Sequence, residues 1–377
     1  MLGIAVRVAQ AMSLHLPNPP FEVPPFEHEM GKRVWYTIGA LDTLLSLDHM
    51  SEPIIRPKAL LSHPPSNIND SDISFDMEGP VRELSGFTDV TYPLIVLNCI
   101  CALRALNFTD FSQPAIKTMN MRQQAAMDFQ QTVSRLLEGC QEDTNPFPWF
   151  VKKTAECMVA TVQLVTLRPM QKCSGFVPPR VHGGGILKLS MNTLQSLHEL
   201  HSDPRGVLWR MSDGSFAIWH AFVVAVSELR ACGDPSLIEQ YWPFIENVYE
   251  EFSSLPESHR GAIWDAVEKF MAKGRAHKDM LASRNPGPPA NVAPTQAHAF
   301  SMANIPSSVD FSPVPMAGPQ SMVPEAPTIA SSHMVGPWPN VFDAVEYGTL
   351  GMDNVHDSSW LNYEGFIDDL FGSQRPG

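Results

Sequence analysis

A chain of 377 residues with 44% hydrophobic and 18% charged residues has the balance of a globular protein and is long enough for one large or two ordinary domains. Its formal net charge of -14 argues against nucleic-acid binding through the overall field of the protein, because neutralising phosphates requires clustered Lys and Arg. Its six scattered cysteines argue against a structural zinc site, and its longest apolar windows are far shorter than the roughly 20 residues of a membrane span.

Two helices are predicted near the start of the chain. The first covers residues 2–15, ends before Pro17 and has apolar residues at steps of three and four: Ile4, Val8, Ala11 and Leu14. Five prolines within residues 17–25 exclude regular structure there. The second helix follows and has its apolar face at Val34, Ile38, Leu41 and Leu45.

The middle of the chain predicts a long loop and then a series of helices. Pro, Ser, Asn and Asp dominate residues 51–87, where their side chains compete for backbone hydrogen bonds and favour turns. Helical periodicity is read over residues 88–108, 121–137, 151–168, 187–197, 215–231, 236–253 and 257–272. The fold class predicted for residues 1–275 is therefore an all-α, multi-helix domain.

The C-terminal hundred residues divide into two segments of different composition. Residues 276–340 are rich in Pro, Ala, Ser, Met and Val, which predicts a disordered linker, because such a segment buries too little surface to offset its ordering entropy. Residues 341–377 form an acidic C-terminal tail, in which aromatic and aliphatic residues are interleaved with Asp and Glu.

The acidic aromatic tail suggests a function without any comparison. Acidic residues keep neighbouring apolar groups solvated and available to fold onto the groove of a partner, as in acidic activation segments. The tail is therefore interpreted as a candidate activation segment with five partner-binding anchors: Trp360, Leu361, Phe366, Leu370 and Phe371. The alternative is a C-terminal helix that docks back on the helical domain.

Patterns that would indicate catalysis are weak. His198 and His201 are three residues apart on a predicted helix, whereas the zinc-protease pattern needs four, with a Glu directly after the first His. The glycines at 183–185 lack the preceding strand and the following Lys-Ser or Lys-Thr of a phosphate-binding loop. No catalytic, cofactor-binding or metal-binding residue is predicted, and the chain is not expected to be an enzyme.

Several segments of the first 275 residues, taken in order, resemble a known family. The segments are residues 5–15 (AVRVAQAMSLH), 29–36 (EMGKRVWY), 41–42 (LD), 65–72 (PSNINDSD) and 159–170 (VATVQLVTLRPM). Together they resemble the helical regulatory region of fungal zinc-cluster transcription factors. Three positions depart from the family pattern: Ser13 replaces the usual glycine, Tyr36 replaces the second Trp, and residues 51–53 (SEP) replace Gly-Arg-Pro.

The resemblance implies a regulatory scaffold, with Arg33, Trp35 and Asp42 in structural roles. It implies a nuclear transcription regulator, expected to be a positive regulator of a pathway or a secondary-metabolite gene cluster. The family's six-cysteine zinc cluster precedes this region, so zinc is expected only if an upstream cluster is missing from this chain. This chain is therefore expected to contact DNA only indirectly, either through such an upstream cluster or through a DNA-binding partner.

The expected partners are the transcription machinery or a co-activator. No association with a membrane is expected. The helical domain is expected to be N-terminally incomplete, which would leave Ile4 and Val8 uncovered and favour a homodimer. The alternative function is a co-regulator or inhibitor that lacks DNA binding and acts through protein–protein interaction.

Overall fold

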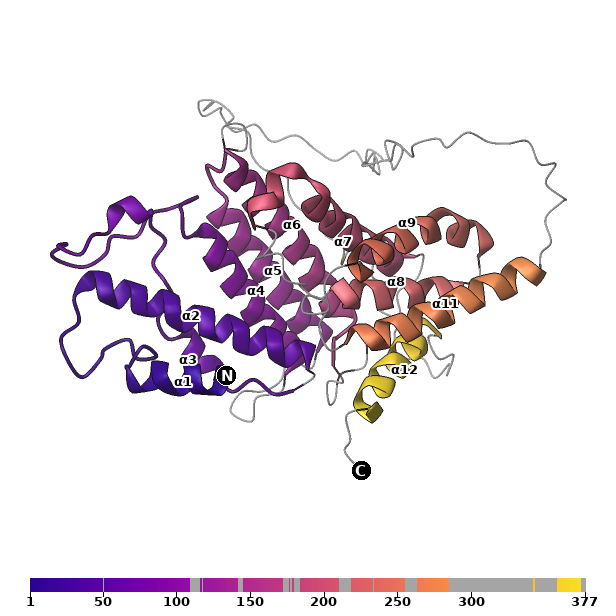
Figure 1. Ribbon diagram of the computed structural model, residues 1–377, viewed down its shortest axis with the longest axis horizontal. Coiled ribbons are helices and arrows are strands. Elements are labelled where there is room, and N and C mark those ends of the chain that lie inside the picture. The colour runs from indigo at the N-terminus through magenta and orange to yellow at the C-terminus, as the bar shows by residue number, and fades with distance from the viewer. Residues whose placement is uncertain are drawn as a thin grey trace, which may run out of the picture. The chain divides into compact units, whose positions relative to one another are not determined.

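The computed structural model confirms an all-helical fold (Figure 1). The structure describes residues 1–49, 51–108, 116, 118–141, 145–171, 176, 178–179, 184–209, 218–232, 234–254, 263–284, 342 and 358–373. Most of the predicted linker, residues 285–340, lies outside this set. The described helices of residues 1–283 and the C-terminal helix belong to one compact unit.

The first two helices form a small core of their own with the loop that follows them. Helix α1 covers Leu2–Ala11 and α2 covers Pro25–Asp48, with Pro25 at the first helical position, where its missing N–H costs nothing. The predicted loop contains a short helix, α3 (Pro57–Leu61), and a 3-10 turn, η1 (Asp70–Asp72). Members of this core include Val6, Trp35, Leu60, Ile68 and Leu94.

Helix α1 ends at Ala11, earlier than predicted, because residue 13 reverses the chain. Ser13 has a φ of 62°. The N–H of Leu14 donates to the carbonyl of Ala9, and that of Ser13 donates to Gln10, both at 3.0 Å. This is the Schellman arrangement, in which the left-handed residue is usually glycine because a Cβ is strained there.

Replacing Ser13 with glycine is expected to stabilise the protein. A non-glycine residue in the left-handed region costs about 1–2 kcal/mol, and part of this is offset by the larger entropy that glycine loses, so we expect a gain of about 0.5–1 kcal/mol. Thermal unfolding should show a rise of about 2 °C in Tm. Ser13→Ala is the matched control. An equal rise in that variant would show that backbone strain is not the cause.

The main core is built around α6, which covers Pro146–Leu167. Sixteen of its 22 residues are buried, and its partly exposed residues include Lys152, Lys153 and Glu156. It packs against α4 (Thr91–Asn107), α5 (Met119–Leu136) and α7 (Gly185–Ser202), beside which it lies in Figure 1. Helix α7 also contacts α8 (Ile218–Cys232), and the short η2 (Pro204–Trp209) contacts α6.

Helix α5 contributes a buried, charged side chain to this core. Met121 is 47% exposed, whereas its neighbour Arg122 is fully buried. The Arg122 guanidinium donates to the carbonyls of Leu106, Val165 and Thr166 at 2.8–2.9 Å. Backbone carbonyls in the last turn of a helix have no partner within that helix, so Arg122 satisfies such groups at the ends of both α4 and α6.

The remaining helices are α9 (Pro235–Ser253), α11 (Trp264–Arg284) and α12 (Ser358–Ser373). Helix α9 continues through Pro243 as one helix. Its N-cap is Asp234, whose carboxylate accepts the N–H of Ser236. Helix α11 continues to Arg284, into the segment predicted as linker from residue 276.

Candidate functional site

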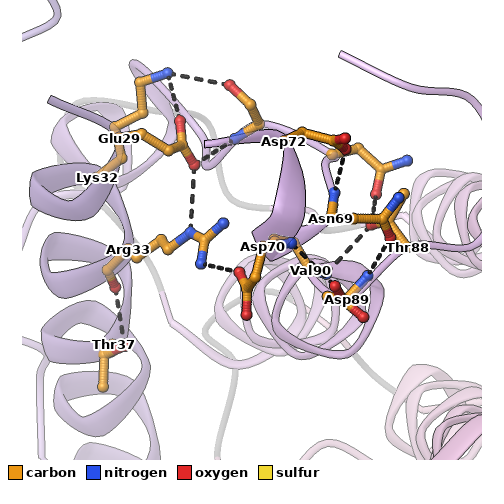
Figure 2. A network of polar contacts seen from close by, with 12 residues as sticks. Glu29, Lys32, Arg33, Thr37, Asn69, Asp70, Asp72, Thr88, Asp89 and Val90 are labelled. Carbon is orange, nitrogen blue, oxygen red and sulfur yellow. Dashed lines mark hydrogen bonds and ion pairs between the residues drawn. The ribbon is translucent and has the colours of Figure 1, made fainter. Parts of the chain in front are cut away.

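A buried carboxylate on α2 holds the middle of the loop. Glu29 is fully buried and accepts the N–H of Ser66 at 3.0 Å. Its carboxylate lies 3.2 Å from Lys32 Nζ and 3.6 Å from Arg33 Nε (Figure 2). Because a buried charge is stable only when it is paired and hydrogen-bonded, these contacts fix both the carboxylate and the loop backbone.

From Arg33 the contacts continue through the loop to the start of α4, as Figure 2 shows. Arg33 Nη1 lies 2.8 Å from Asp70, whose N–H donates to Asp89 at 2.9 Å. The N–H of Asp89 donates to Asn69 Oδ1 at 3.2 Å. Asn69 and Asp72 also form a reciprocal capping box around η1. We call these polar residues the loop clamp: Glu29, Lys32, Arg33, Ser66, Asn69, Asp70, Asp72 and Asp89.

A second acid of α2 holds the beginning of the loop. Asp42 is 1% exposed, and its two carboxylate oxygens accept the N–H groups of Ile54 (3.0 Å) and Ile55 (2.8 Å). Trp35 is buried and donates from Nε1 to the carbonyl of Ala59 at 3.1 Å. These contacts agree with the structural roles expected for Arg33, Trp35 and Asp42.

The C-terminal helix α12 presents a continuous apolar face to the helical domain. Tyr363, Phe366, Ile367 and Leu370 are 0%, 2%, 1% and 6% exposed. Phe366 lies between Trp219 of α8 and Phe270 of α11, with ring centroids 6.1 and 5.3 Å away. The spacing of three, four and seven residues from Tyr363 places all four side chains on one side of the helix.

Polar contacts fix α12 at the end of α6. The hydroxyl of Tyr363 donates to the carbonyl of Pro169 at 2.7 Å, and Ser359 Oγ donates to the Glu228 carboxylate. Glu228 also lies 3.5 Å from Arg168 Nη2, which is buried. The Arg168 guanidinium lies 6.0 Å from the centre of the Trp360 ring. This set of contacts, with the apolar face above, is called the α12 seat.

In the described part of the tail, residues 358–373, helix α12 is docked on the helical domain, as in the alternative interpretation. Of the five predicted anchors, Phe366 and Leu370 are buried against the domain, Trp360 is half-buried, and Leu361 is 45% exposed. The side chain of Phe371 lies outside the described residues. Sequence reasoning did not include Tyr363 and Ile367 among the contact residues, although their helical spacing from Phe366 and Leu370 is a readable signal.

The opposite side of α12 is acidic. Asp368 and Asp369 are exposed, and Asp369 lies 2.9 Å from Lys273 Nζ in an ion pair that is more than half exposed at both ends. Exposed ion pairs of this kind contribute little to stability, about 0–1 kcal/mol. The apolar face, rather than this pair, holds α12 in place.

His220 is a buried titratable residue beside the α12 seat. It is fully buried beside Tyr363, with ring centroids 5.7 Å apart, and donates from Nε2 to the carbonyl of Arg168 at 2.6 Å. Burial lowers the pKa of His220 to about 4, and the Arg168 charge adds to this effect. The folded protein therefore holds His220 neutral.

Stability is expected to fall as the pH drops from about 6.5 towards 4. In the unfolded chain the pKa of His220 is near 6.5, so the unfolded chain binds a proton that the folded chain excludes. The free energy of unfolding should therefore be about 2 kcal/mol lower at pH 5 than at pH 7 because of His220. Urea unfolding of wild type and His220→Gln at both pH values measures this. His49→Gln, at an exposed position, is the control and should keep the wild-type difference. An unchanged pH dependence in His220→Gln would contradict the assignment.

The residues that the structure describes do not fit a zinc site. No group of three or more His, Cys, Asp or Glu side chains is placed to hold a metal ion within this part of the chain. Burial raises the pKa of the Cys99 thiol and brings that of Cys101 to about 11, which disfavours the thiolates that bind zinc. His198 lies 2.6 Å from Glu251 and is paired with that carboxylate.

The described helices include none that is long and apolar enough to cross a membrane. Residues 1–125, which contain the loop clamp, match the model of the fungal specific transcription factor domain. No solved structure matches the chain.

Among curated proteins, the chain is similar to fungal C6 finger domain transcription factors. It is 30% identical over 320 residues to nscR of Arthroderma benhamiae, covering 82% of this chain and 44% of that protein. It is 30% identical over 369 residues to nscR of Aspergillus fumigatus, covering 94% and 44%. It is 28% identical over 324 residues to adaR of Aspergillus niger, covering 78% and 40%. The chain thus spans less than half the length of these relatives.

Proposed function

Because the chain belongs to the family of fungal transcription factors with this regulatory domain, we propose that it is a nuclear positive regulator whose activation segment is α12. The family supports transcription regulation, and the C6 finger named in its relatives supports DNA contact through a zinc-cluster segment or a DNA-binding partner. The resemblance further favours control of a pathway or secondary-metabolite gene cluster.

The observation that carries the proposal is the two-sided character of α12. One side has the buried row Tyr363, Phe366, Ile367 and Leu370, and the other has the exposed acids Asp368 and Asp369. An amphipathic acidic helix of this kind fits the hydrophobic groove of a co-activator. Since the apolar row is covered by α8 and α11, the segment must leave its seat before it binds a partner.

A reporter assay tests the activation segment. Residues 341–377 are fused to a foreign DNA-binding domain, and the fusion is expected to raise reporter expression well above that of the DNA-binding domain alone. The matched control replaces Trp360, Phe366 and Leu370 with alanine and keeps every acidic residue. This variant should be silent if the apolar anchors bind the partner. Equal activity of both fusions would show that charge alone is responsible.

A second function follows from the covered position of the apolar row. With Phe366 and Leu370 buried, the chain as it stands offers few anchors, which favours a co-regulator or inhibitor that acts through protein–protein interaction. The same assay distinguishes the two functions. A silent fusion of residues 341–377, at a protein level equal to that of an active reference, would reject activation and favour the inhibitor.

A further inference from the structure

A cleft on the surface between α6 and α7 is separate from the sites described above. The two helices pack side by side (Figure 1), and the cleft between them has a volume of ≈ 380 Å³. The residues that line it belong neither to the loop clamp nor to the α12 seat. We call it the α6–α7 cleft. Its two ends and its floor differ in chemistry, and this difference defines the kind of ligand that it can hold.

One end of the α6–α7 cleft has an excess of negative charge. Lys153 Nζ lies 3.0 Å from the Glu156 carboxylate and 3.4 Å from that of Glu199, on the opposite wall. Two carboxylates around one ammonium leave one negative charge uncompensated. All three side chains are partly exposed. This end therefore attracts a cation, and the net charge of -14 on the whole chain acts in the same direction.

The floor and the other end of the cleft suit an aliphatic chain and a hydrogen-bond donor. Val159 and Leu189 line the floor and are 3% and 4% exposed. At the far end Gln163 is 5% exposed, and its Nε2 donates to Gln130 Oε1 at 3.3 Å. Among the residues that the structure describes, none donates to the amide oxygen of Gln163. A buried acceptor without a donor is costly, so this oxygen is suited to accept an N–H group of a ligand.

We propose that the α6–α7 cleft binds a linear aliphatic polyamine. One ammonium group lies between the carboxylates of Glu156 and Glu199. The methylene chain covers the apolar floor, and an amine at the other end donates to the amide oxygen of Gln163. Gln163 follows Glu156 by seven residues on α6, which is about two helical turns and about 10 Å along the helix axis. This span suits a triamine such as spermidine, whereas a single amine reaches only one end.

Lys153 distinguishes a polyamine from other ligands. An anion such as phosphate is repelled by the excess negative charge. A zwitterionic amino acid places its carboxylate on Lys153 and its ammonium group on Glu199. For a polyamine, by contrast, Lys153 is a repulsive neighbour that competes for the same two carboxylates. Removing the Lys153 charge should therefore strengthen the binding of a polyamine and weaken that of an amino acid.

Isothermal titration of the full chain with spermidine at about 0.15 M salt tests the proposal. Wild type is expected to bind spermidine saturably at a single site. Glu199→Gln should weaken this binding about tenfold and Lys153→Met should strengthen it about tenfold, because each changes one charge beside the bound ammonium group. Putrescine, a shorter diamine that cannot reach both ends, should bind at least tenfold more weakly than spermidine. Glu239→Gln removes an exposed acid on α9, outside the cleft, and is the matched control with unchanged affinity.

Three outcomes would overturn the proposal. The first is a wild type that shows no saturable binding of spermidine. The second is an equal loss of affinity in Glu199→Gln and Glu239→Gln, since the attraction would then come from the overall charge of the chain. The third is weaker binding in Lys153→Met, since Lys153 would then hold the ligand rather than repel it. Circular dichroism checks that the helices of each variant are intact, and Glu156→Gln repeats the test on the other wall if Glu199→Gln fails to fold.

Discussion

Replacing Ile367 with aspartate is expected to raise reporter expression at least tenfold when the full chain is fused to a foreign DNA-binding domain. Ile367 is 1% exposed in the α12 seat and is not one of the proposed anchors. Burying an unpaired carboxylate costs several kcal/mol, and each 1.4 kcal/mol shifts the balance between docked and released α12 tenfold. The released helix keeps all its anchors and gains an acid, so its activity should increase.

The control is the same substitution in the fusion of residues 341–377 alone, where no seat exists and expression should change little. Phe366→Asp in the full chain gives a further comparison, because it should release α12 but also remove an anchor. If Ile367→Asp leaves the full chain as silent as wild type while the isolated tail is active, masking by the α12 seat is wrong. A rise in both fusions would mean that the added acid, rather than release, is responsible.

Replacing Arg122 with methionine is expected to destabilise the protein by about 3–5 kcal/mol. Methionine fills much of the volume but leaves the carbonyls of Leu106, Val165 and Thr166 without the guanidinium that now satisfies them. It also removes the cation 4.2 Å above the Phe176 ring. Chemical denaturation followed by circular dichroism measures the loss.

Arg135→Met is the matched control for Arg122→Met. Arg135 lies on the same helix but is exposed, so its replacement should change stability by no more than about 0.5 kcal/mol. Arg122→Lys separates the effect of the charge from that of the guanidinium geometry. The lysine ammonium keeps the charge but lacks the planar set of donors that reaches all three carbonyls. We expect it to recover only part of the lost stability. Equal unfolding curves for Arg122→Met and Arg135→Met would show that Arg122 contributes no more than a surface residue.

The helices were predictable because most of them carry a regular apolar period. The structure contains α4, α5, α7 and α8 close to the predicted ranges, and α6 begins earlier, at Pro146. Helix α9 also lies close to its predicted range although it contains Pro243, because a proline inside a helix removes only one hydrogen bond and neighbouring helices can compensate. Helix α1 stops early because of a backbone reversal at Ser13, a residue type that gives no such signal.

The contacts of the candidate site were less predictable than its residues. The apolar residues of α12 recur at steps of three and four, and this spacing can be read from the sequence. Whether α12 packs on its own chain or binds a partner depends on Trp219 and Phe270, which the fold brings together from distant segments. Glu29 meets Ser66 across 37 positions of sequence, and nothing local indicates that pairing. Arg122 resembles an ordinary surface arginine in sequence, and only the ends of α4 and α6 explain its burial.

The two buried acids of α2, Glu29 and Asp42, have a consequence for the order in which parts of the protein unfold. The loop N–H groups of Ile54, Ile55 and Ser66 donate to carboxylates of α2 that are almost fully buried, rather than to water. Amide hydrogens in an irregular segment usually exchange rapidly with solvent, because local opening costs little there. These three amides are therefore expected to exchange only when the loop separates from α2. Although the loop is irregular, we expect it to unfold together with that helix.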